Sequence, residues 1–358
     1  MSVIAYVSGH GFGHAAREVE ILRHLPPDIR LVVKSSSPEW FWREEMHRPF
    51  DFVGDSFDVG CVQRDSLHID VPATLAAARA MATENRRRVG SERAYLAGIG
   101  ARIVVSDVAS FPLAVAADAG IANVCIANFT WADIYAAFVE EEPKFAEIVE
   151  EMLGQYHRAD TCLDTDLALP MPYWRRRESV GLVARPGVGR REELDLLLPP
   201  AASGKKVALL YVGNWGYAVD YARLERYADW QFVSYETPPY PPTNWTVLRR
   251  AHDWPHPDLV ASVDLVISKP GYGITAECLS TGTPLLYPPR PEFAEYTALH
   301  AALSEWPGGI FIDRERFESL DWVDGLLDAT RVGRSPALPA PGGPATAARI
   351  AAAYRATE

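Results

Sequence analysis

Short apolar runs rich in β-branched residues alternate with stretches of helical periodicity along this chain, and they do so in two separate series. The first series contains the expected strands Val3–Val7, Arg30–Lys34, Arg102–Ser106 and Asn123–Ala127. The second contains Lys206–Tyr211, Trp230–Ser234, Thr246–Leu248, Leu265–Ser268 and Pro284–Tyr287. Such alternation is typical of parallel βαβ units. The sequence therefore predicts an α/β protein with two doubly wound, Rossmann-like sheets.

Glycine and proline cluster between these series, over Gly181–Gly204, and only one short acidic helix is expected there. A chain of 358 residues is long enough for two domains. We expect an N-terminal domain over 1–184, completed by a C-terminal helix over 345–356, and a second domain over 190–335. Ligands of such folds bind at the carboxyl ends of the strands, which here would face a central cleft.

The formal net charge is -12, which disfavours nucleic acid and anionic lipid as partners. Two basic runs, Arg86–Arg88 and Arg175–Arg177, are interpreted as solvated surfaces. The four cysteines show neither C-x-x-C nor zinc-type spacing, as expected in a reducing compartment. No signal peptide or transmembrane segment is recognisable. We expect a soluble, cytoplasmic protein.

The first expected strand leads into a glycine-rich loop, Ser8–His14, and a helix follows. Glycines let the backbone approach a ligand, and a helix N-terminus offers free N–H groups to an anion. The loop is a poor dinucleotide fingerprint, because its third glycine would fall on His14 and Lys34 replaces the ribose-binding acid. A Rossmann dehydrogenase is therefore disfavoured.

Two histidines of this loop are candidate functional residues. A neutral imidazole can accept a proton near physiological pH, so His14 is a candidate general base. His10 and Gly11 could contact an acceptor. Alternatively, one or both histidines cap the helix or bond to backbone carbonyls.

The second series contains a similar strand–loop–helix motif, Asp264–Glu277. Ser268, Lys269, Gly271 and Gly273 form its loop, and the helix that follows would add its dipole to an anion site. Glu277 lies one turn into that helix, where its carboxylate could bind a ribose diol. A carboxylate in a first helical turn is also favoured by the dipole alone.

Two further loops of this half carry candidate donor-binding residues. Arg290 and Glu295 follow the strand at Pro284–Tyr287 and could meet sugar hydroxyls or phosphate, or could belong to a solvated loop. Gly213 and Asn214 belong to a third glycine loop, directly after the strand at Lys206–Tyr211.

Polar and aromatic residues also follow two strands of the first half. Asp107 is either a second candidate base or a helix N-cap. Asn128 could bind acceptor hydroxyls, and Trp131 could offer a platform to a sugar face. Core packing is the alternative for Trp131.

Three segments carry a family resemblance: Ser8–Arg17 (SGHGFGHAAR), Val105–Tyr135 (with SDV, AADAG and NFTWADIY) and Asp264–Glu277 (DLVISKPGYGITAE). Together they resemble the glycosyltransferase-like domain that precedes the kinase domain in plant L-arabinokinases, and bacterial stand-alone proteins of that kind. More distantly, the loops ending at His14 and Glu277 resemble the N-acetylglucosaminyltransferase of peptidoglycan synthesis.

This resemblance implies a GT-B fold, with acceptor binding in the N-terminal domain and donor binding in the C-terminal domain. It places His14 near the reaction centre, Glu277 on the ribose, and Gly271 and Gly273 on the diphosphate. Glu295 stands where the distant relative uses glutamine against the donor sugar. The kinase half has no counterpart here, so arabinose phosphorylation is not expected.

The resemblance also bears on the reaction. Asp164-Thr165-Asp166 matches the D-x-D metal motif of another glycosyltransferase fold, but the motif is short and we interpret it as coincidence. Lys269 stands where the E-x₇-E pattern of many retaining enzymes would need an acid, which favours inversion.

We therefore expect a metal-independent glycosyltransferase without a cofactor. Its co-substrate would be a uridine-based nucleotide sugar, and its acceptor a small molecule or a protein. A non-catalytic nucleotide-sugar-binding module and a nucleotide-sugar 2-epimerase remain alternatives.

Overall fold

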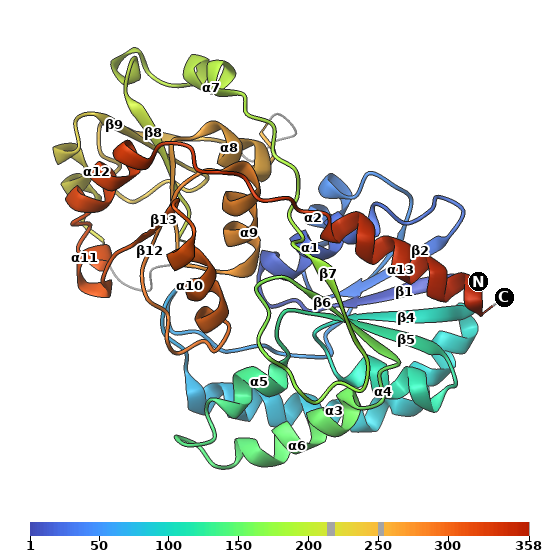
Figure 1. Ribbon diagram of the computed structural model, residues 1–358. Helices are drawn as coiled ribbons and strands as arrows, with labels where there is room; N and C mark the ends of the chain where they lie inside the picture. Colours follow the sequence, from blue (N-terminus) through green and yellow to red (C-terminus); the bar gives the residue numbers. More distant parts are fainter. Residues whose placement is uncertain (213–218, 250–253, 358) are drawn as a thin grey trace.

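The computed structural model describes residues 1–212, 219–249 and 254–357, which form two α/β lobes (Figure 1). The chain passes between the lobes twice, after β7 and again before the C-terminal helix α13 (Figure 1). No helix among the described residues is both long and apolar enough to cross a membrane.

The first lobe contains a seven-stranded sheet of the described residues, in the order β3-β2-β1-β4-β5-β6-β7, with all its strand pairs parallel. Its strands are β1 (Ser2–Val7), β2 (Arg30–Ser35), β3 (Asp51–Gly54), β4 (Ala101–Asp107), β5 (Ala122–Ala127), β6 (Thr161–Thr165) and β7 (Arg177–Gly181). The strand order reverses between β1 and β4, where Val7 pairs with Asp107. Loops that leave the carboxyl ends of these two strands diverge to opposite faces and open a crevice for a ligand.

The helices of this lobe cover both faces of the sheet. They are α1 (Phe12–Leu22), α2 (Glu39–Glu45), α3 (Val71–Gly98), α4 (Phe111–Asp118), α5 (Trp131–Ala136), α6 (Phe145–Tyr156) and α13 (Gly342–Ala356). The long helix α3 starts where the Asp70 side chain accepts a hydrogen bond from the Ala73 N–H, an N-cap that satisfies a free donor of the first turn.

The second lobe contains a six-stranded parallel sheet of the described residues, in the order β10-β9-β8-β11-β12-β13. Its strands are β8 (Lys206–Leu210), β9 (Trp230–Ser234), β10 (Trp245–Val247), β11 (Leu265–Ile267), β12 (Leu285–Tyr287) and β13 (Gly309–Phe311). Its helices are α7 (Arg191–Leu197), α8 (His256–Ser262), α9 (Tyr272–Thr281), α10 (Tyr296–Glu305), α11 (Arg314–Glu318) and α12 (Val323–Val332), with 3₁₀ turns at Pro200–Ala202 and Tyr221–Arg226. The strand order reverses between β8 and β11, which creates a second crevice.

The C-terminal helix returns to the first lobe. Helix α13 packs against α1 and β7, and its Tyr354 hydroxyl donates to the Met1 carbonyl at 3.4 Å. The expected fold class, two doubly wound Rossmann-like sheets, is confirmed. All nine expected strands are present with ends within two residues of those expected, whereas β3, β6, β7 and β13 were not expected.

Candidate active site

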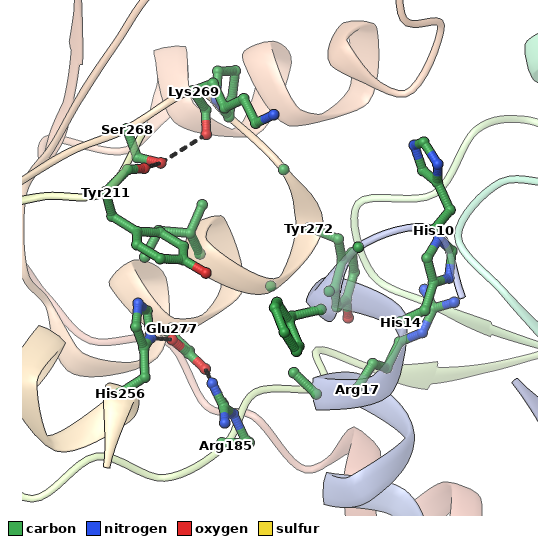
Figure 2. A pocket seen from close by; sticks show the side chains of 18 of the residues that line it. His10, His14, Arg17, Arg185, Tyr211, His256, Ser268, Lys269, Tyr272 and Glu277 are labelled. Atoms are coloured by element: carbon green, nitrogen blue, oxygen red, sulfur yellow. Dashed lines mark hydrogen bonds and ion pairs between the residues drawn. The ribbon is translucent and has the colours of Figure 1, made fainter. Parts of the chain in front are cut away.

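A cavity of about 490 Å³ lies between the lobes, at the carboxyl ends of both sheets. Figure 2 shows His14 on one side of it and Glu277 on the other, so the candidate base and the candidate ribose ligand face one crevice. The predicted site residues that line the cavity are His10, Gly11, His14, Asn128, Ser268, Lys269, Gly271, Gly273, Glu277, Arg290 and Glu295.

Two other predicted residues do not line the cavity, and two more are not described. Asp107 and Trp131 are fully buried behind the cavity instead of lining it. Gly213 and Asn214 lie outside the described residues. Trp131 therefore has the position that core packing predicts, and it offers no surface to a sugar.

Two helix N-termini open into the cavity. Helix α1 begins after Gly11, whose φ of 75° favours glycine, and α9 begins after Gly271; neither has a side-chain cap. The two loops touch, because a Cβ on Gly273 would lie 3.7 Å from the Gly13 Cα. Free N–H groups and the positive ends of two helix dipoles therefore meet at one place, which suits an anion.

His14 is backed by a buried carboxylate. Its Nδ1 lies 2.8 Å from Oδ2 of Asp107, which comes from the end of the neighbouring strand β4. Burial alone would raise the pKa of Asp107, but the charges and hydrogen bonds of His14 and Arg17 lower it to about 2. Asp107 is therefore ionised, and it can orient the imidazole and stabilise its protonated form.

Arg17 completes this arrangement, although it was not among the predicted site residues. Its guanidinium, one turn along α1 from His14, forms an ion pair with Asp107 and donates to the Asn128 side chain. It also lies over the Tyr272 ring of the second lobe, 5.2 Å from the ring centre. The spacing of three between His14 and Arg17 was the available signal, since it places both on one helix face.

The buried ring of Trp131 packs against both histidines of the first loop. Its ring centre lies 5.2 Å from that of His10 and 5.8 Å from that of His14. Its indole N–H donates to Asp58 at 3.0 Å, and burial raises the pKa of Asp58 to about 6. Burial, together with the charges of His14, Arg290 and Lys269, lowers the pKa of His10 to about 3, so His10 is neutral.

Glu277 is held by partners that the sequence did not reveal. Its Oε1 accepts from Arg185 Nε and Nη2 at 2.9 and 2.8 Å, and its Oε2 lies 2.8 Å from His256 Nδ1 (Figure 2). Arg185 also pairs with Glu45 of α2 at 3.0 Å, so this linker residue bridges the lobes. Burial opposes ionisation, but Arg185 and His256 lower the pKa of Glu277 to about 2.

Aromatic side chains surround this end of the cavity. Tyr211, which follows β8, lies 4.7 Å from the His256 ring, and Tyr235 lies 5.9 Å from it. Trp254 lines the same wall. Flat apolar faces beside an ionised carboxylate suit a nucleoside, whose base can stack while its ribose forms hydrogen bonds.

The remaining predicted donor residues lie in the loops after β11 and β12. The Ser268 hydroxyl donates to the Tyr211 carbonyl at 2.5 Å, so it fixes the loop (Figure 2). Glu295 accepts from Asn128 Nδ2 at 2.7 Å across the cleft, and burial raises its pKa. Arg290 is a buried cation and Lys269 a partly exposed one, and both line the cavity.

Metal ligands are not concentrated in the described part of the chain, where no cluster of three or more His, Cys, Asp or Glu residues could hold an ion. In the D-x-D segment, Asp164 lies in β6 and pairs with Arg177 of β7 at 3.1 Å. Its carboxylate therefore links two strands of the sheet.

Sequence comparison shows that the chain is similar to a curated protein. L-arabinokinase of Arabidopsis thaliana is 31% identical over 327 residues, which are 89% of this chain and 31% of that protein. The chain thus spans about a third of the length of this relative. A scan against models of known protein families found no match.

Solved structures with the same fold are nearly co-extensive with this chain. A UDP-glucosyltransferase from Polygonum tinctorium, capable of glucosylating indoxyl, aligns over 99% of this chain and 98% of its own with a TM-score of 0.64 and 16% identity. The calicheamicin glycosyltransferase aligns over 100% and 98%, with a TM-score of 0.62 and 16% identity. A Siraitia grosvenorii UGT transferase in complex with UDP aligns over 99% and 100%, with a TM-score of 0.57 and 13% identity. This protein therefore has the GT-B glycosyltransferase-like fold and is distantly similar to L-arabinokinase.

Proposed function

We propose that this protein is an inverting, metal-independent glycosyltransferase that moves a sugar from a uridine diphosphate sugar to an acceptor hydroxyl. One observation carries the proposal: a histidine backed by a buried carboxylate and an uncapped helix N-terminus followed by Glu277 line the same interlobe cavity. The UDP bound to the structural neighbour from Siraitia grosvenorii agrees with this choice of nucleotide.

The donor would lie along the second lobe. Its diphosphate would accept hydrogen bonds from the free N–H groups at the start of α9, whose dipole favours negative charge. Glu277 would accept from the ribose hydroxyls, because Arg185 and His256 keep it ionised and still leave a lone pair unused. The base would stack among Tyr211, Tyr235 and Trp254.

The acceptor would enter from the first lobe. Since Nδ1 of His14 faces Asp107, Nε2 is the nitrogen that can take the proton of the acceptor hydroxyl. The acceptor oxygen would then bond to the anomeric carbon while the bond from that carbon to the diphosphate breaks, and the diphosphate would leave with the electron pair. Two helix N-termini would stabilise the charge that develops on it.

Asp107 would act through His14 and not as the base itself. Its carboxylate is fully buried and is occupied by His14, Arg17 and the Ser8 N–H, so an acceptor could not reach it. We assign it a positioning role.

Thermal unfolding with a panel of nucleoside diphosphates and their sugars tests the nucleotide site. We expect UDP at about a hundred times its Kd to raise the Tm by about 5 °C, because a ligand that binds only the folded state stabilises it. The variant Glu277→Gln should lose most of this rise, whereas the exposed control Glu84→Gln should keep it. If no nucleoside diphosphate raises the Tm, the proposed function is wrong.

Released UDP distinguishes transfer from the other activities. A transferase should release UDP from its donor sugar in proportion to acceptor. A binding module would release none, and a 2-epimerase would convert the donor without an acceptor, so either result would contradict the proposal.

A further inference from the structure

Two cations that line the cavity, the buried Arg290 and the partly exposed Lys269, form no ion pair with any described residue. Arg290 is 6% exposed, and its Nε has no hydrogen-bond partner among the described residues. Lys269 forms no ion pair with any described residue, and burial together with the charge of Arg290 lowers its pKa to about 8. An unpaired buried charge is costly, which indicates that a ligand completes the site.

The neighbouring carboxylates are already occupied. Glu295 accepts from Asn128 at 2.7 Å, and Glu292 pairs with Arg314 at 2.8 Å. Asp65, whose charge acts on Lys269, lies 2.8 Å from His68 Nδ1. Glu295 and Glu292 act on Arg290, and Asp65 on Lys269, through space only, and none of these carboxylates forms an ion pair with either cation.

The pair lies on the side of the cavity away from the proposed nucleoside site. Lys269 extends toward His10 and away from Glu277 (Figure 2), and its charge acts on His10. The guanidinium of Arg290 lies 4.5 Å from the ring centre of Phe293, and its charge acts on His10 and on Cys61 of the first lobe. The diphosphate has its own donors at the start of α9.

We propose that Arg290 and Lys269 bind a second oxyanion, distinct from the diphosphate, that is carried by the transferred sugar or by the acceptor. The inference rests on the proposed function, because it assigns a charged substrate to the same site. The Arg290 guanidinium lies over the Phe293 ring, and the edge of a guanidinium matches a carboxylate or a phosphate in bidentate geometry. The lysine would add a point charge.

Calorimetric titration of UDP, UDP-glucose and UDP-glucuronate tests whether the transferred sugar carries the oxyanion. The two sugars differ only at C6, where glucuronate has a carboxylate in place of the hydroxymethyl group of glucose. If the donor carries the oxyanion, UDP-glucuronate should bind at least about tenfold tighter than UDP-glucose. Arg290→Gln should remove this preference and leave the affinity for UDP within about twofold. Arg331→Gln, an exposed arginine of α12, should behave as wild type.

The same protein saturated with UDP tests the acceptor as the source. Glucuronate or glucose 6-phosphate should then raise the Tm where glucose does not, and Arg290→Gln should abolish that rise. Without ligand, Arg290→Gln should unfold at or above the wild-type Tm, since it removes an unpaired buried charge. A clearly lower Tm would make Arg290 structural and overturn the inference.

Two further results would overturn it. If the wild type binds UDP but prefers neither UDP-glucuronate over UDP-glucose nor an anionic sugar over glucose, the inference is wrong while the proposed function stands. If Arg290→Gln weakens UDP as much as every UDP-sugar, Arg290 is a diphosphate ligand. Failure of the wild type to bind any of these nucleotides would instead refute the proposed function, and the inference with it.

Discussion

Replacing His14 with alanine should lower the rate of sugar transfer by about 10²–10⁴-fold. The affinity for UDP should stay within a few-fold of wild type, because the proposed nucleoside contacts come from the second lobe. The loss would arise from the missing proton acceptor beside the acceptor hydroxyl. Transfer rates with saturating donor, together with calorimetric UDP binding, measure both quantities.

Three comparisons make this result specific. His157→Ala removes an exposed histidine at the end of α6 and should leave transfer unchanged. Asp107→Asn keeps the shape of the buried side chain but removes its charge, so it should lower kcat and shift the pH profile while KM changes little. A His14→Ala variant that loses UDP affinity as severely as it loses transfer would show that His14 is a binding residue.

The sequence predicted those strands whose apolar runs are buried on both faces. Strands β1, β4 and β5 lie at the centre of the first sheet and are buried over most of their length, which explains the apolar runs that they contain. Edge strand β7 has an exposed, charged side, and in the sequence its first residue belongs to a basic run, so the strand was not expected. In the structure Arg177 pairs with Asp164 of β6. Short edge strands such as β3 and β13 are too brief for a periodic signal.

The placement of candidate site residues around one cavity was predictable where they directly follow a strand. The glycine loops, His14 and Glu277 each come after a recognisable apolar run, and parallel topology brings such positions together. Partners such as Arg185 could not be deduced, because a linker has no periodicity that fixes its path between lobes. For Trp131 the sequence left a sugar platform and core packing both open, and its position in a buried apolar cluster decides for core packing.

Replacing Arg185 with alanine should lower the free energy of unfolding by about 3–5 kcal/mol, because it leaves a buried carboxylate without the arginine that pairs with it. Arg185 is 7% exposed and pairs with Glu277 and Glu45, so its loss leaves two carboxylates without their cation. It is also a contact between the lobes. Urea unfolding monitored by fluorescence measures the change, and UDP affinity should fall as Glu277 loses its orientation.

The pH dependence of this loss separates an ionic cause from a packing cause. The pKa of Glu277 is lowered to about 2 in the folded protein, so the stability that it contributes is complete above its ordinary pKa and is lost as the pH falls toward 2. The stability difference between wild type and Arg185→Ala should therefore narrow below about pH 4.5. Arg86→Ala, which removes an exposed pair with Glu151, should cost less than about 1 kcal/mol at every pH. A difference for Arg185→Ala that stays constant from pH 7 into this acidic range would show that the guanidinium acts through packing alone.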